Sequence, residues 1–182
     1  MRNNSRLTKM VIVGLFIALE IILTRFCSIN TPIIRIGFGF LPVAMLAIMF
    51  GPLWAGVAYA IGDILGMMIF PSGQYFPGFT LTAFLTGLVF GLVLYNKKIT
   101  YVRSFFAALV VCGVLNLCLD TLWLYILTGQ GILALLPARL LKVAIAIPIQ
   151  TILITTVWNG CVKKVAPQFA VNTNNTAEKT AA

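Results

Sequence analysis

Three side chains that could recognise a flat, polar ligand recur at helical spacing within one apolar stretch. Asn116, Asp120 and Trp123 stand at positions i, i+4 and i+7, so one face of a helix would carry all three. A carboxylate accepts two parallel N–H bonds from an amino-substituted ring, and an indole stacks on the face of such a ring. Trp123 alone is more typical of a membrane interface, and Asn116 alone of a bond between helices. Together they predict a ligand site.

Three carboxylates lie inside apolar runs, where an ionised side chain is costly and usually faces the interior of a helix bundle. They are Glu20, Asp63 and Asp120. Two roles stay open for each carboxylate, a ligand contact or a structural ion pair. The pairs would join Glu20 to Arg25, and Asp120 to Arg139 or Lys142. Asp63 is the most structural of the three, because the glycines that flank it indicate close helix packing.

Four cations stand at the ends of apolar runs or in the loops between them, on the side toward which the three carboxylates lean. They are Arg25, Arg35, Arg139 and Lys142. If every carboxylate within the runs pairs with one of them, a positive charge is still left over. An anionic ligand would neutralise it.

The segment PSGQYFPGFT, residues 71–80, interrupts two long apolar runs with rigid, aromatic and hydrogen-bonding residues. Its two prolines restrict the backbone, which lowers the entropic cost of ordering the segment around a ligand. Gln74 offers a hydrogen-bond donor and acceptor, and Tyr75 and Phe79 offer flat faces. We expect this segment to form a lid over the ligand.

Residue patterns for several chemistries are missing. The chain has no histidine, no Gly-x-x-x-x-Gly-Lys-Ser/Thr loop and no nucleophile elbow. The four cysteines lack metal-ligand spacing, so we expect them to pack as small apolar side chains. We therefore expect no enzyme, no cofactor and no metal, but a binding component that takes its energy from another protein.

The composition excludes an ordinary soluble domain. The chain has 182 residues, of which 60% are hydrophobic and 9% charged, and its mean hydropathy is +1.02. The apolar residues form continuous runs near the roughly 20 residues that a helix needs to cross a bilayer. We predict an all-α integral membrane protein, a bundle of six transmembrane helices. The spans are 8–26, 37–50, 53–70, 79–95, 103–127 and 138–162. Residues 1–165 form one domain and residues 166–182 a disordered cytoplasmic tail.

The basic residues indicate the orientation of these spans. Six spans place the N-terminus, the turn near residue 51, the loop near residue 98 and the C-terminus on one side. That side carries Arg2, Arg6, Lys9, Lys97, Lys98, Arg103, Lys163 and Lys164. By the positive-inside rule both termini are cytoplasmic. The cations Arg25, Arg35, Arg139 and Lys142, the segment 71–80 and the ligand site then belong to the outer end.

Three segments resemble the membrane-embedded substrate-binding (S) components of energy-coupling factor (ECF) transporters, in particular the folate-specific S component. The segments are FGPLWAG at 50–56, GDILG at 62–66 and QYFPGFTL at 74–81, and the likeness covers residues 8–165. The third segment is the most specific, since the Phe-Gly-Pro turn is shared by S components for several vitamins.

The resemblance implies a six-helix protein that binds a vitamin near its outer face, under the loops that join helices 1–2, 3–4 and 5–6. Such proteins dock on a transmembrane coupling (T) subunit that carries two ATP-binding-cassette ATPase subunits, and they topple in the membrane to deliver the vitamin. Gly14 and Ala18 match the small-residue docking motif of the family on helix 1, with glycine in place of its first alanine.

For folate, the resemblance and the residues converge on a division of roles. Asp120 and Asn116 would bind the pterin edge, with Trp123, Tyr75 or Phe79 stacked on the ring. The glutamate tail of folate has two carboxylates, and the outer cations Arg25, Arg35, Arg139 or Lys142 would bind it.

Other functions stay open. The chain could be the S component for riboflavin, thiamine, biotin or a queuosine precursor. It could also be a stand-alone, ion-coupled transporter that uses Glu20 or Asp63 as its proton site. A membrane enzyme is disfavoured, because the sequence offers no catalytic constellation.

Overall fold

The computed structural model describes residues 2–27, 29–30, 35–71, 76–97, 99–129 and 132–162. Its elements, in chain order, are α1 (Arg2–Arg25), β1 (Ile29–Asn30), β2 (Arg35–Ile36), α2 (Phe40–Phe50), α3 (Pro52–Ile69), α4 (Pro77–Leu94), α5 (Tyr101–Leu109), η1 (Val110–Leu119), α6 (Asp120–Thr128), α7 (Ile132–Val157) and η2 (Trp158–Val162). The predicted helical membrane fold is confirmed. The predicted tail, 166–182, lies outside the described residues.

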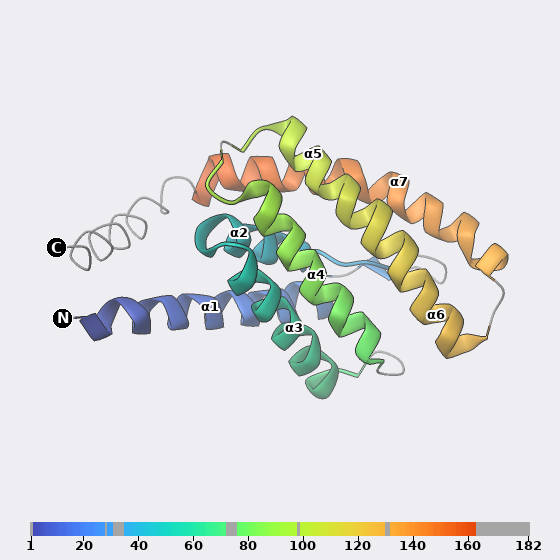
Figure 1. Ribbon diagram of the computed structural model, residues 1–182, viewed down its shortest axis with the longest axis horizontal. Helices are drawn as coiled ribbons and strands as arrows, with labels where there is room; N and C mark the ends of the chain where they lie inside the picture. The colour runs from blue at the N-terminus through green and yellow to red at the C-terminus, as the bar shows by residue number, and fades with distance from the viewer. Residues whose placement is uncertain are drawn as a thin grey trace.

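Five helical stretches in the described part of the chain are long and apolar enough to cross a membrane. They are Leu7–Arg25, Pro52–Ile69, Pro77–Leu94, Tyr101–Leu127 and Arg139–Gly160. The fifth predicted span is continuous from α5 through η1 to α6 (Figure 1). Five of the six predicted spans therefore correspond to helices of spanning length.

The second predicted span is different, because α2 has only 11 residues. At 1.5 Å per residue it measures roughly 16 Å, about half of the hydrocarbon core. It begins at Phe40, whereas residue 37 was the predicted start, and a two-stranded antiparallel ladder precedes it. In this ladder Ile29 pairs with Ile36 and Asn30 with Arg35. The short ladder therefore lies in the connection between the first two predicted spans.

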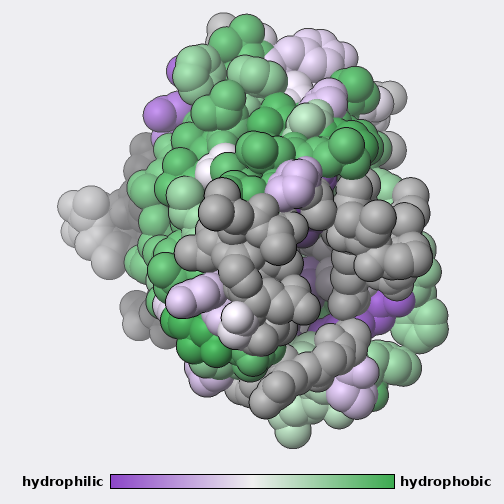
Figure 2. All heavy atoms as spheres, turned by 90° about the vertical axis from the view of Figure 1, so that its right-hand side faces the viewer, coloured by the Kyte–Doolittle hydropathy of each residue, from purple (hydrophilic) through white to green (hydrophobic). Residues whose placement is uncertain are grey.

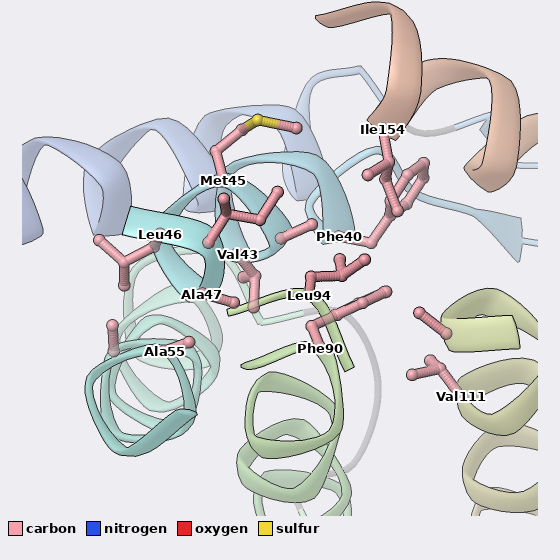
Figure 3. Close-up of a cluster of buried hydrophobic side chains, with 14 of the residues drawn as sticks. Phe40, Val43, Met45, Leu46, Ala47, Ala55, Phe90, Leu94, Val111 and Ile154 are labelled. Carbon is pink, nitrogen blue, oxygen red and sulfur yellow. The ribbon is translucent and has the colours of Figure 1, made fainter. Parts of the chain in front are cut away.

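Burial explains why so short a helix persists. Eight of its residues are buried, from Phe40 to Ile48, and no side of it is polar. Its side chains share one buried apolar cluster with Phe90 and Leu94 of α4, Val111 of η1 and Ile154 of α7 (Figure 3). The other helices, rather than lipid, thus supply the apolar surroundings of α2.

Small residues set the spacing between α3 and α4. A Cβ placed on Gly87 would lie 2.5 Å from the carbonyl oxygen of Ala55, and one on Gly91 would collide with Pro52. The turn before α3 depends on Gly51, whose φ of 93° is strained for other residues. Gly87 and Gly91 therefore let the backbones of α3 and α4 approach closely.

The last helix starts earlier than expected. α7 begins at Ile132, so Pro137, predicted to open the sixth span near residue 138, lies inside the helix together with Pro148. Neighbouring helices can satisfy the backbone groups that a proline frees within a membrane.

The ends of the elements gather at two poles (Figure 1). The start of α1, the α2–α3 turn, the connection from α4 to α5 and the end of α7 lie toward the left. The β1–β2 ladder, the end of α6 and the start of α7 lie toward the right. The right-hand pole therefore brings together the elements in which the outer ligand site was predicted.

Candidate ligand-binding site

A cavity of ≈ 230 Å³ lies among the helices. Its described lining residues are Thr24, Gly37, Gly39, Phe40, Tyr59, Thr86, Val111, Asn116, Asp120, Lys142, Ala146, Ile149 and Gln150. They come from α1, α2 with the residues before it, α3, α4, η1, α6 and α7. Figure 2 looks onto the right-hand pole of Figure 1 and shows a hollow with hydrophilic atoms inside a largely hydrophobic surface. The cavity thus combines apolar walls with a few polar groups, as small-molecule sites do.

The structure brings three of the predicted site residues to this cavity. Asn116 at the end of η1, Asp120 at the start of α6 and Lys142 in α7 all line it. Asp120 lies within electrostatic range of both Lys142 and Arg139, which offset its charge. A carboxylate, an amide and an ammonium group in the lining of one cavity can bind a ligand that carries both N–H donors and negative charge.

Arg139 does not line the cavity, but it contacts the backbone of a residue that does. In an α-helix the N–H of Asp120 would bond to the carbonyl of Asn116, four residues back. Here that N–H bonds to the carbonyl of Leu115, five residues back, which is the π-helical pattern. Nη1 of Arg139 donates to the carbonyl oxygen of Asn116 at 3.2 Å instead. The guanidinium group therefore satisfies a backbone oxygen that the π-helix leaves without its α-helical donor.

Trp123 lies outside the cavity wall, although the helical spacing placed it with Asn116 and Asp120. The π-helix changes the rotation of Asn116 relative to both Asp120 and Trp123, and on α6 itself these two residues lie about 60° apart around the helix axis. The indole Nε1 donates to the hydroxyl of Thr82 at 3.1 Å, and that hydroxyl donates to the carbonyl of Gly78 at 3.2 Å. Trp123 thus anchors α6 on α4.

The aromatic residues at the start of α4 pack with Trp123. The ring centroids of Phe76 and Trp123 are 5.6 Å apart, and those of Phe76 and Phe79 are 6.3 Å apart. Phe79 is half-buried in this cluster and does not line the cavity. Gln74 and Tyr75 lie outside the described residues. The predicted lid is therefore described only at its flanks.

The two other predicted cations are Arg25 and Arg35. Arg25 lies apart from the cavity, and only the backbone of Arg35 is described. Arg25, the last residue of α1, packs its guanidinium against Gly66 of α3, 3.2 Å from where a Cβ would stand. It does not line the cavity. Arg35 is placed by its backbone in β2, opposite Asn30.

The remaining carboxylates hold helices together. Asp63 of α3 accepts a hydrogen bond from the hydroxyl of Thr80 in α4 at 2.8 Å, consistent with a structural role. Glu20 is 3% exposed, accepts a hydrogen bond from Thr24 and packs against Gly62. Neither carboxylate lines the cavity.

Several lining residues were not identified from the sequence. Tyr59, Thr86 and Gln150 each stand inside an apolar helix and line the cavity. Gln150 carries the clearest signal, since an amide in the middle of an apolar span is costly unless a bundle or a cavity receives it. Tyr59 and Thr86 give little signal, because both residue types are common in such helices.

The small pair on α1 lies on the surface. Gly14 and Ala18 are both exposed, and no atom of another element in the described part of the chain lies within 4 Å of a Cβ placed on Gly14. Large apolar side chains surround them on the same helix, including Val11 at 68% and Leu15 at 67% exposed. This face of α1 is free to contact lipid or another membrane protein.

Comparison with known proteins gives a consistent result. Residues 4–161 match the family described as the S component of the ECF-type riboflavin transporter. The chain is 52% identical over 149 residues to the folate transporter FolT of Clostridium novyi (strain NT), covering 82% of this chain and 87% of that protein. It is 30% identical over 146 residues to the folate transporter FolT of Leuconostoc mesenteroides subsp. mesenteroides, covering 77% and 78%.

A solved structure is similar over most of the chain. The crystal structure of FolT bound with folic acid aligns with a TM-score of 0.78 at 38% identity, covering 82% of this chain and 92% of that one. The fold, the cavity at one pole and the family match agree with one another. The chain belongs to the family of S components of ECF-type transporters, and it is a multi-pass membrane protein.

Proposed function

We propose that this chain is the folate-binding S component of an ECF importer and that folate binds in the cavity lined by Asn116, Asp120 and Lys142. The observation that carries the proposal is the presence of these three residues in the lining of one cavity. Its support is the similarity to two folate transporters and to a FolT structure bound with folic acid.

Asp120 has the chemistry to bind the pterin ring of folate. The pterin presents an amino group beside a ring N–H, and a carboxylate accepts both in parallel. Asn116 supplies a further polar contact from the preceding turn. Lys142 offsets the charge of Asp120 and can bind an anionic group of the ligand. Arg25, Arg35, Gln74 and Tyr75 remain candidates for contacts to the glutamate tail and for the lid.

The energy for import would come from partner subunits. In this proposal a T subunit and two ATPase subunits use ATP, and the S component binds no cofactor of its own and catalyses no reaction. The exposed face of α1 around Gly14 and Ala18 would dock on the T subunit. Both termini would face the cytoplasm, in line with the basic residues that the positive-inside rule places there.

Titration of the purified chain with folate tests the ligand and the site. We expect saturable binding by calorimetry, and Asp120→Ala to weaken it at least about 100-fold. This loss corresponds to two charge-assisted hydrogen bonds of roughly 1.5–3 kcal/mol each. Asp63→Asn is the matched control, because Asp63 bonds to Thr80 away from the cavity. Equal affinity in wild type and Asp120→Ala would remove Asp120 from the site.

Riboflavin is the second candidate ligand, because the matching family is described by riboflavin. Its flavin ring also carries an N–H donor, although it lacks the adjacent amino group of a pterin. A parallel titration with riboflavin separates the two. Tight riboflavin binding without a folate response would overturn the folate assignment and keep the S-component family.

A further inference from the structure

Glu20 is a buried carboxyl group outside the proposed ligand cavity. Its side chain is 3% exposed, and Oε1 accepts a hydrogen bond from the hydroxyl of Thr24 at 2.9 Å. Oε2 is buried and has no hydrogen-bond partner within the described part of the chain. A buried polar atom without a partner destabilises a fold, so its presence requires an explanation beyond packing.

Two glycines from other parts of the fold enclose the Glu20 side chain. A Cβ on Gly39, the residue before α2, would collide with Oγ1 of Thr24 and lie 3.1 Å from Oε1 of Glu20. On the other side, a Cβ on Gly62 of α3 would collide with Oε2. The Glu20–Thr24 pair therefore joins α1 to the start of α2 and to the middle of α3.

The segment held by this pair forms one wall of the cavity. Thr24 lines the cavity itself, and so do Gly37, Gly39 and Phe40. Gly37 also packs on Thr24, because a Cβ there would lie 3.9 Å from its Cγ2. Any displacement of Thr24 would thus change the shape of this wall.

We propose that Glu20 is a positioning residue for the cavity: through Thr24 it holds the Gly37–Phe40 segment in place. The ligand-related part of this inference rests on the proposed function. This role explains why a carboxyl group with an unpartnered oxygen is kept here. A side chain of this length fills the space between Gly39 and Gly62 and still accepts the hydrogen bond from Thr24. A shorter side chain would leave the segment unsupported.

Hydrogen–deuterium exchange of the ligand-free full chain tests the positioning role directly. In Glu20→Ala we expect the amides of residues 37–44 to exchange about 10-fold faster than in wild type, because local opening becomes easier. In Glu20→Gln we expect rates within about 2-fold, since the amide oxygen still accepts from Thr24. Amides of α4 serve as the internal reference and should not change in either variant.

Folate binding adds a second measurement on the same variants. Glu20→Ala should weaken binding about 10-fold through a faster dissociation rate, and Glu20→Gln should keep the wild-type affinity within about 3-fold. Rescue by glutamine separates a positioning role from a loss of stability caused by any substitution at this position.

If Glu20→Ala fails to fold, Thr24→Val decides the matter, because it keeps the volume of threonine and removes the hydroxyl donor. We expect the same local increase in exchange. Wild-type exchange at residues 37–44 in Glu20→Ala or, where that variant does not fold, in Thr24→Val would overturn the proposal. Because exchange is measured without ligand, this result is independent of whether folate binds. Absence of folate binding with the predicted exchange pattern would reject the proposed ligand only.

Discussion

At the scale of single residues, the hydrogen bond from Trp123 to Thr82 distinguishes an anchor from a stacking platform. Trp123→Phe removes the 3.1 Å bond and keeps most of the aromatic packing on Phe76. We expect a loss of about 1 kcal/mol in stability, the typical net value of one hydrogen bond. The folate affinity should stay within about 3-fold, because Trp123 does not line the cavity. Thermal unfolding and calorimetry in detergent measure the two quantities.

The control for this prediction is Trp54→Phe, since Trp54 is 47% exposed on the apolar surface. It should change neither stability nor affinity. A loss of affinity above 10-fold in Trp123→Phe alone would show that the indole contacts the ligand, as the helical spacing had predicted.

Residue types identified part of the site and missed the rest for a physical reason. Asn116, Asp120 and Lys142 were predicted because polar or charged groups in apolar helices are costly and thus informative. Tyr59 and Thr86 were missed, because whether they face a cavity depends on how distant helices pack. Phe79 is the opposite case. Its residue type suggested a ligand contact, but in the structure it packs in an aromatic cluster with Phe76.

At the scale of elements, η1 determines which side chains the fifth span presents to the cavity. Arg139→Met removes the donor to the carbonyl of Asn116 and keeps an unbranched, apolar side chain. A fully buried acceptor without a partner costs about 1–3 kcal/mol, and this acceptor is partly buried, so we expect η1 to shift and folate binding to weaken about 10-fold. Calorimetry on the purified variant measures the effect.

Arg139→Lys is the matched variant, because lysine keeps the charge and one donor without the planar fork of arginine. We expect an intermediate affinity. If both variants bind folate as wild type does, the guanidinium does not position Asn116. If lysine and methionine weaken binding equally, the planar donor rather than the charge is required.

Elements were predictable to the extent that hydropathy alone determines them. The long spans follow from apolar runs of spanning length, and the α2–α3 turn follows from Gly51 and Pro52. The length of α2 could not be predicted, because an apolar run has the same sequence pattern whether lipid or protein surrounds the helix. The π-helix could not be predicted either, since the donor to its Asn116 carbonyl comes from Arg139, 23 residues further along the chain.

At the scale of the whole molecule, α1 carries the proposed docking face and the proposed positioning residue of the cavity on opposite sides. Ala18 and Glu20 are two residues apart, so their side chains point in roughly opposite directions around the helix. Ala18 lies on the exposed face with Gly14, and Glu20 packs against Gly39 and Gly62 beside the cavity wall. A force applied to the exposed face of α1 would therefore reach the cavity wall through a single helix.

Ala18→Leu separates docking from ligand binding. Small residues let two membrane helices approach closely, and a leucine side chain at their contact keeps them apart. Ala18 is exposed within this chain, so the purified variant should fold and bind folate as wild type does. In cells that also produce the T subunit and the ATPases, we expect folate uptake to fall at least about 10-fold.

Ala144→Leu is the matched control, because Ala144 is equally exposed but lies on α7. It should leave both binding and uptake unchanged. Loss of uptake in both variants would mean that added bulk anywhere on the apolar surface impairs transport. Normal uptake in Ala18→Leu would contradict docking through this face. Loss in Ala18→Leu alone, with intact binding, would place the partner contact on α1, directly behind the residue that we propose holds the cavity wall.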